Sequence, residues 1–187
     1  LVRCVVAALT LTPAAGAAQD LDSGLEAYES GNYAVALQEL RPLAERGDAR
    51  AQFFLGVMYQ QGHGVEDDAA EAVRWYRLAA EQGHADAQAN LGFMYDLSLG
   101  VAEDAAEAIR WYQLAAEQGH AHVQWLLGRM YDQGRGVPQD FSTAHMWFNI
   151  AAANGEERAA ELRDIVEGRM TAADISEAQR RARVCME

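Results

Sequence analysis

An almost identical phrase of eleven residues occurs twice in this chain, and it is the feature that most constrains the fold. "WYRLAAEQGHA" covers residues 75–85, and "WYQLAAEQGHA" covers residues 111–121. The second phrase begins 36 positions after the first and differs from it at one residue, which is Arg77 in the first and Gln113 in the second. An active site is normally built once, so a phrase repeated at a fixed distance predicts a repeated packing unit.

The same period extends along most of the chain and includes several residue types. Identical residues recur 36 positions apart at Gly47, Gly83, Gly119 and Gly155, at Gly56, Gly92 and Gly128, at Tyr59, Tyr95 and Tyr131, at Gly64, Gly100 and Gly136, at Asp68, Asp104 and Asp140, and at Trp75, Trp111 and Trp147. A period in this range is typical of an array in which neighbouring units bury one another's apolar faces.

The first half of each unit predicts a helix with a glycine in its interior. In residues 51–61, apolar side chains recur at helical spacing around Gly56. Because an interior glycine weakens a helix by about 1 kcal/mol relative to alanine, we expect close contact with another helix to offset this cost. Gly62 and Gly64 then end the helix, since they permit positive φ.

The second half of each unit predicts a longer helix with one apolar face. Asp68 is the expected N-cap, and Gly83 is expected to end the helix. The apolar face consists of Ala72, Trp75, Tyr76, Ala79 and Ala80. Each unit is therefore predicted to be a helix, a turn and a second helix.

These motifs resemble the Sel-one-like repeat, a relative of the tetratricopeptide repeat. The resemblance is carried by "AQxxLGxMYxxG", then "GV", an aspartate, a tryptophan and "LAAEQG", and it covers three units at residues 51–86, 87–122 and 123–158. It implies an all-α, right-handed superhelical solenoid of helix pairs that acts as an adaptor or regulator without chemistry of its own. Residues 19–50 resemble a shortened, tetratricopeptide-like unit, and residues 159–187 are expected to form capping helices.

The chain departs from this pattern in two ways. Ser98 stands where the other loops carry glycine, which leaves the shape of that loop open. The cysteines that bridge each helix pair in one branch of the family are missing, so an activity special to that branch is not transferred.

The charge of the chain excludes several classes of partner. It has 28 acidic residues, 15 basic residues and a net charge of −13. Nucleic acid and anionic lipid surfaces both require clustered positive charge, so neither is expected as a partner.

Residues 1–18 read as a signal peptide, with a disordered apolar tail as the alternative. Arg3 precedes an apolar run over residues 4–12, and small residues precede Gln19. The run is too short for a membrane span. Cleavage would predict a periplasmic or secreted protein in which Cys185 is the remaining cysteine, so no internal disulfide is expected.

Signals for chemistry are weak, and we expect no enzyme, cofactor or metal site. His120 and His122 form an H-x-H pair without a third ligand nearby, so they are interpreted as loop residues. The acidic cluster at residues 66–71 is interpreted as helix capping around Asp68 rather than as a catalytic pair of carboxylates. His145 replaces Val73 and Ile109 of the other units, which leaves a buried or a groove-facing role open.

Positions that do not repeat are the candidates for binding, because scaffold residues recur whereas ligand contacts need not. They lie on the first helix of each unit, which lines the concave face in related arrays. The candidates are Phe53, Val57, Asn90, Phe93, Trp125 and Arg129. Aromatic residues and arginine are enriched as binding anchors, and packing between neighbouring pairs is the alternative.

The sequence therefore predicts an exported protein-interaction module that binds a protein or peptide on its concave face. Binding of a cell-wall glycan or its peptide stem is the alternative, and a hydrolase is the third, less favoured, hypothesis. The sequence does not indicate an oligomeric state.

Overall fold

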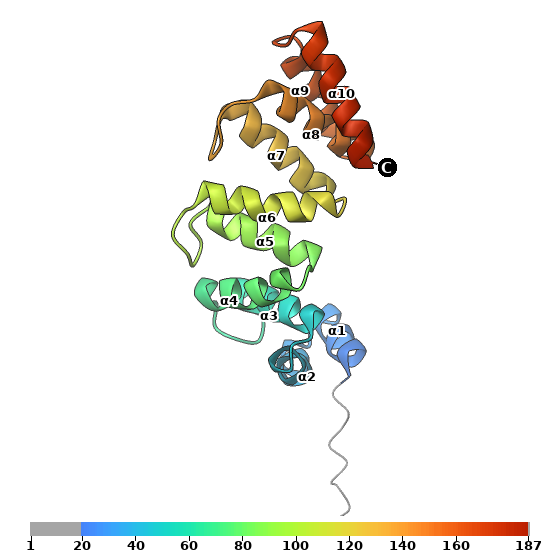
Figure 1. Cartoon of the computed structure of the whole chain (residues 1–187). Coiled ribbons are helices and arrows are strands. Elements are labelled where there is room, and N and C mark those ends of the chain that lie inside the picture. The colour runs from blue at the N-terminus through green and yellow to red at the C-terminus, as the bar shows by residue number, and fades with distance from the viewer. Residues whose placement is uncertain (1–19, 187) are drawn as a thin grey trace, which may run out of the picture.

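The chain folds into a stack of helices. The computed structural model describes residues 20–186, and within this range ten helices and no strands are present. The helices are α1 (Leu21–Glu29), α2 (Tyr33–Glu45), α3 (Ala49–Gln61), α4 (Ala69–Glu81), α5 (Ala85–Asp96), α6 (Ala105–Glu117), α7 (Ala121–Gln133), α8 (Phe141–Ala153), α9 (Glu157–Glu167) and α10 (Ala172–Met186). Figure 1 shows them stacked in chain order, and the expectation of an all-α solenoid of helix pairs is confirmed.

The helix pairs begin about two residues before the positions expected from the sequence. Helix α3 begins at Ala49 rather than at residue 51, because the Asp48 carboxylate accepts a hydrogen bond from the Ala51 N–H at 2.9 Å and caps the helix. Asp68 caps α4 in the same way by accepting from Ala70 and Glu71. The acidic cluster before α4 therefore contains the predicted N-cap.

The interior glycines allow the two helices of a pair to approach closely. A Cβ atom on Gly92 would lie 2.6 Å from the nearest ring carbon of Tyr112, on the other helix of the pair. Gly56 and Gly128 meet Tyr76 and Phe148 in the same way. The loss of helix propensity at the interior glycines is thus offset, as predicted, by close contact between the backbone of one helix and an aromatic ring of the other.

Each repeated tryptophan fills the space between neighbouring pairs. Trp111 on α6 is 5% exposed and belongs to the same buried cluster as Val73, Ala79 and Ala80 of α4. Trp147 packs in the corresponding way against the residues of α6. These side chains therefore join one pair to the pair before it, as expected for an array that shares a continuous core.

A polar contact also recurs between pairs. The Gln88 amide donates to the Ala80 carbonyl at 3.1 Å and accepts from Gln118 at 2.8 Å. Gln88 is 4% exposed, so these bonds satisfy a buried amide at the boundary between α4 and α5. The equivalent bonds of Gln52 and Gln124 repeat this arrangement along the array.

The single difference between the two copies of the phrase has a structural explanation. Arg77 donates to the Tyr95 hydroxyl at 2.7 Å, and Gln113 donates to the Tyr131 hydroxyl at 3.1 Å. Arginine and glutamine therefore form the same hydrogen bond to the tyrosine hydroxyl of the following pair, since both carry N–H donors.

The loop that contains Ser98 keeps the left-handed turn of the other loops. Ser98 has φ of 57°, close to the φ of 68° at Gly62, and its hydroxyl donates to the Val101 carbonyl at 3.3 Å. Among the described residues that are not glycine, Ser98 alone has positive φ. The loss of glycine therefore leaves the loop conformation in place.

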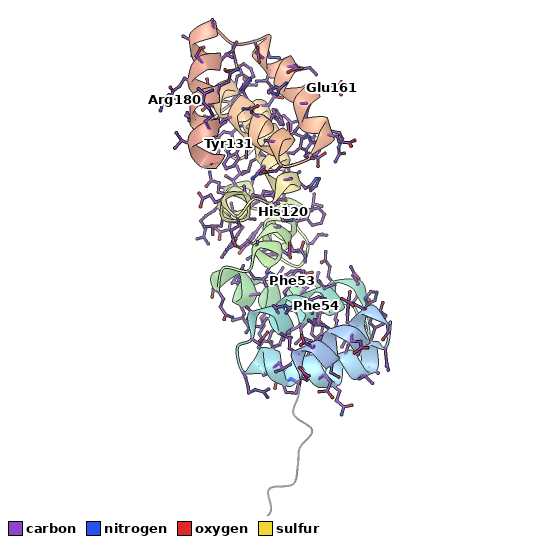
Figure 2. All side chains as sticks on the ribbon, turned by 90° about the vertical axis from the view of Figure 1, so that its right-hand side faces the viewer. Phe53, Phe54, His120, Tyr131, Glu161 and Arg180 are labelled. Atoms are coloured by element: carbon purple, nitrogen blue, oxygen red, sulfur yellow. The ribbon has the colours of Figure 1, made fainter. Side chains whose placement is uncertain are left out.

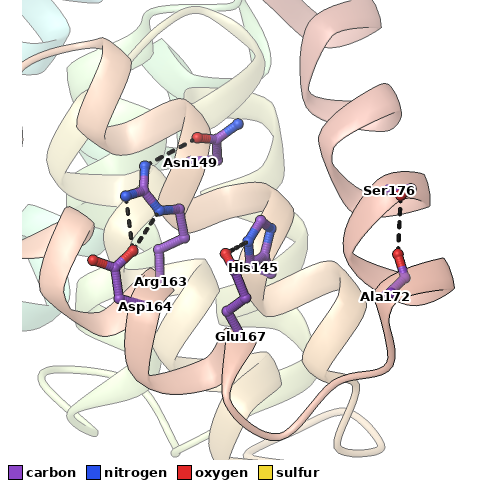
Figure 3. Close-up of polar contacts among 7 residues, drawn as sticks. All are labelled: His145, Asn149, Arg163, Asp164, Glu167, Ala172 and Ser176. Carbon is purple, nitrogen blue, oxygen red and sulfur yellow. Dashed lines mark hydrogen bonds and ion pairs between the residues drawn. The ribbon is translucent and has the colours of Figure 1, made fainter.

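The C-terminal helices cover α8, and His145 is part of this contact. His145 is fully buried on α8, and its Nε2 atom lies 3.1 Å from the Glu167 carboxylate of α9 (Figure 3). Arg163 of α9 reaches Asn149 of α8 at 3.4 Å in the same region. His145 thus has the buried role of the two that the sequence left open.

Two sequence expectations fall outside this description. The expected signal peptide at residues 1–18 and the side chain of Cys185 lie outside the described residues. None of the helices in residues 20–186 combines the length and the apolar character that a bilayer span requires.

Candidate binding site

A hollow of about 600 Å³ lies at the middle of the array, between the first helices of three successive pairs. We call it the central hollow. Val57 of α3, Asn90 and Phe93 of α5 and Arg129 of α7 lie on its wall, so four of the six predicted residues line it. Side chains from the second helices, α4 and α6, contribute to its lining as well.

The hollow exists because a small residue occupies one position of the repeat. Phe53 of α3 stacks on His84 with ring centroids 4.7 Å apart. One unit later the corresponding residues are Ala89 and His120, so no aromatic ring fills the space next to the histidine, and both residues line the hollow. Sequence reasoning selected the aromatic residues and missed Ala89, although an alanine between two aromatic positions was the available signal.

Two buried tyrosines on the second helices face the hollow, and they differ in hydrogen bonding. Tyr76 donates to the Gln60 side chain at 2.5 Å. Tyr112 is 1% exposed, and its hydroxyl has no hydrogen-bond partner among the described residues. An unsatisfied buried hydroxyl costs roughly 1–3 kcal/mol, so a ligand that bonded to it would recover part of this cost.

Tyr112 does not have the acceptor that Gln60 provides for Tyr76. Asp96 takes the place of Gln60 in the next unit, and its carboxylate lies 2.7 Å from the Arg135 guanidinium. Arg135 also donates to the Asp96 main-chain carbonyl at 3.0 Å. The ion pair therefore holds the carboxylate toward the α7–α8 loop.

Burial shifts the pKa of both groups. Desolvation raises the pKa of the Asp96 carboxyl, and Arg135 opposes this shift by stabilising the charged form. Burial also raises the pKa of the Tyr112 hydroxyl, with the negative charge of Asp96 adding to the effect. Tyr112 is therefore protonated at neutral pH and can donate a hydrogen bond.

The apolar part of the wall is accessible. Phe93 is 41% exposed, and Leu97 at the end of the same helix is 48% exposed. Val57 lies across from them on α3 and is partly buried. Exposed aromatic area beside hydrogen-bonding groups is the combination found in ligand sites.

Of the two roles that the sequence left open for Trp125, binding anchor and packing residue, the structure supports packing. Trp125 is 9% exposed and belongs to the buried cluster that includes Phe148 of α8 and Ala159 of α9. The guanidinium groups of Arg129 and Arg158 lie 4.9 Å and 4.6 Å from its ring centroid. The side chains of the following helices therefore cover this tryptophan, which the sequence of α7 alone does not show.

Phe53 also lies outside the lining of the central hollow. It lies next to Phe54 on α3 (Figure 2) and packs edge-on against it. It also stacks on His84, so it contributes to packing between pairs. Phe53 and Trp125 are thus the two predicted residues that the structure does not bring into the hollow.

The two histidines that line the hollow each lie close to a carboxylate. His120 lies 3.7 Å from Asp86, and His122 lies 3.3 Å from Glu156. Over residues 20–186, no cluster of three or more potential ligands from histidine, cysteine, aspartate and glutamate could hold a metal ion. The arrangement is suited to hydrogen bonding and apolar contact with a ligand.

Comparison with solved structures supports the fold assignment. A Sel1 repeat protein from Oxalobacter formigenes has 35% sequence identity and a TM-score of 0.75 over 78% of this chain and 60% of its own. The protective antigen c5321 of uropathogenic Escherichia coli, which has an SLR fold, has 40% identity and a TM-score of 0.71 over 74% of this chain and 31% of its own. The chain therefore corresponds to less than two thirds of the length of either protein.

Comparison with sequence families shows to which family the chain belongs. No curated protein matches the chain at a significant level. The family model described as Sel1 repeat matches residues 49–84, 85–120 and 121–156, and each match begins where a first helix of a pair begins. These matches cover more than half of the sequence, and the chain belongs to the Sel1 repeat family.

Proposed function

We propose that this protein is an exported interaction module that binds an extended segment of a partner protein in the central hollow. Sel1 repeat proteins are generally protein-interaction modules without enzymatic activity. Binding at the concave face, in this hollow, and export of the chain are the specific parts of the proposal.

The observation that carries the proposal is the unpaired Tyr112 hydroxyl in a hollow with an exposed aromatic wall. Asn90 lies on the same wall, and its amide can both donate to and accept from a peptide group. An extended segment offers main-chain carbonyls for Tyr112 and Asn90, and an apolar side chain for Phe93. A binding energy concentrated on a few such anchors is typical of protein interfaces.

The test is photo-crosslinking from within the hollow. A photo-reactive phenylalanine analogue replaces Phe93 in one variant, and replaces Leu114 of α6 in a matched control, because Leu114 is 37% exposed and lies outside the hollow lining. After irradiation in the source cells, mass spectrometry identifies the adducts. We expect peptide adducts at position 93 and none at position 114.

Other results of this experiment contradict the proposal. A sugar adduct at position 93 would establish the glycan-binding alternative in its place. The same adducts at both positions, or adducts at position 114 alone, would show that the hollow is not the binding surface.

Export has a separate test. The basic start, the apolar run and the small residues before Gln19 support a signal peptide at residues 1–18. We expect the mature chain to begin near Ala18 or Gln19, which mass spectrometry of the protein from its cells would show. A chain that retains Arg3 would contradict export.

A further inference from the structure

The central hollow has a charge balance opposite to that of the chain as a whole. The chain carries a net charge of −13. Of the described residues that line the hollow, Asp96 is the one acid, whereas Arg129 and Arg135 are both cationic. The Asp96 charge is already matched by Arg135 at 2.7 Å, so the charge of Arg129 is left over.

Arg129 has no hydrogen bond or ion pair with another described residue. Its guanidinium lies 4.9 Å from the centroid of the Trp125 ring. Asp132, one turn further along α7, forms an ion pair with Arg169 at 3.1 Å instead. Arg129 is therefore held in position by an aromatic face, while its N–H donors remain available.

Other arginines in the array show that this arrangement is unusual. Arg74 and Arg110 also stack on tryptophans, with distances to the ring centroids of 4.8 Å and 4.5 Å. Each of them also pairs with a glutamate one turn earlier on its own helix, at 3.0 Å and 2.7 Å. Arg129 differs from both, because it stacks on a tryptophan at the edge of the hollow but forms no ion pair with a described residue.

We propose that the segment bound in the central hollow is acidic, and that Arg129 pairs with a carboxylate of that segment. This inference rests on the proposed function and specifies the chemistry of its partner. A planar guanidinium that is already oriented binds a carboxylate through two parallel hydrogen bonds with a small loss of side-chain freedom. The negative charge elsewhere on the chain repels acidic segments, so the positive edge of the hollow directs them to this one place.

The structure also indicates what accompanies the carboxylate. Phe93 of α5 and Arg129 of α7 lie on neighbouring first helices and line the same hollow. A bound segment can therefore place an acidic residue at Arg129 and an apolar residue at Phe93. The recognised partner is a peptide segment in which acidic and apolar side chains are close in sequence.

The experiment selects binders to the purified chain from a random peptide library displayed on phage. We expect the selected sequences to be enriched in aspartate and glutamate next to apolar residues. In a synthetic peptide of selected sequence, exchange of the acid for its amide should weaken binding to the wild-type chain about tenfold. This comparison uses the wild-type chain and does not depend on the folding of a variant.

Two variants assign the effect to a residue. In Arg129→Met, which keeps most of the side-chain volume over Trp125, the acid and amide peptides should bind equally well. The matched control is Arg74→Met, which removes a stacked arginine from α4 outside the hollow and should leave the tenfold preference intact. An acid preference that survives in Arg129→Met would overturn the assignment to Arg129.

The remaining outcomes separate this inference from the proposed function. Peptides that bind the wild-type chain, fail to bind Phe93→Ala and show no enrichment in acids would overturn the acidic partner and leave peptide binding in place. A selection without any peptide that depends on Phe93 would overturn peptide binding in the hollow, and the acidic partner with it.

Discussion

Replacement of Gly92 by alanine tests whether the repeated interior glycine is explained by helix contact. In an isolated helix the change to alanine stabilises by up to about 1 kcal/mol. Here the new Cβ would lie 2.6 Å and 2.7 Å from two ring carbons of Tyr112 and 3.2 Å from the Ala108 carbonyl oxygen. Carbon atoms pack at roughly 3.5–4.0 Å, so α5 and α6 would have to separate by about 1 Å.

The expected result is therefore opposite in sign to the helix propensity. Overpacking of this kind costs about 1–3 kcal/mol, and the gain in propensity offsets about 1 kcal/mol of it, so the net destabilisation is up to about 2 kcal/mol. For a chain of this size, that corresponds to a melting temperature lower by up to about 8 °C. Thermal and urea unfolding followed by circular dichroism measure both quantities.

Gly168 provides the matched control. It ends α9 with φ of −63°, and a Cβ at this position would come no closer than 3.5 Å to its neighbours. Gly168→Ala should therefore be neutral or stabilising by about 0.4–1 kcal/mol. If Gly92→Ala raises the melting temperature as Gly168→Ala does, close contact with Tyr112 does not explain the repeated glycine.

Three further predictions follow from the same contacts. Gly83→Val should lower the unfolding free energy by more than about 1 kcal/mol, because Gly83 has φ of +88°, and unchanged thermal unfolding would contradict this reason. Trp125→Ala and Trp111→Ala should both destabilise by about 3–5 kcal/mol, since both rings are buried, and a Trp125 variant that melts like the wild type would restore its role as an exposed binding residue. Arg135→Met should destabilise by roughly 1–3 kcal/mol at neutral pH by leaving the buried Asp96 carboxylate unpaired. The folded-state pKa of Asp96 is raised, so the contribution of this carboxyl to stability falls as pH rises through that pKa. At acidic pH the carboxyl is protonated and no longer needs a cation, so the loss of unfolding free energy in Arg135→Met should shrink when urea unfolding is measured at lower pH. A loss that does not change with pH would refute the assignment.

Much of the candidate site could be recognised from positions that break the repeat. Val57, Asn90, Phe93 and Arg129 were selected because they vary where scaffold residues recur, and the structure places all four on the central hollow. Val57, Phe93 and Arg129 share one helix position in successive units, and Asn90 lies three residues before Phe93 on the same helix. Regular stacking turns equal positions into one surface. An alanine between two aromatic positions marked Ala89 in the sequence, but its place on the wall of the hollow depends on how the neighbouring pairs pack around it.

What the sequence by itself determined was the repeated unit. Gly92, Trp111 and Asp104 recur at one period, and each acts mainly within a helix pair or on the pair next to it. Interactions of such short range can be read from spacing, because helical geometry sets which side chains share a face. Stacking of the pairs then follows from the apolar face that a single pair cannot bury.

Only the tertiary structure shows which side chains at the end of the array are buried and which residues they contact. Trp125 is covered by helices α8 and α9, and His145 is buried against Glu167 of α9, a helix that follows the last repeat. It also decided that Asp96 pairs with Arg135, 39 residues away, and that the Tyr112 hydroxyl has no hydrogen-bond partner among the described residues. Burial and pairing of this kind depend on segments distant in the chain, and no local period encodes which of them will meet.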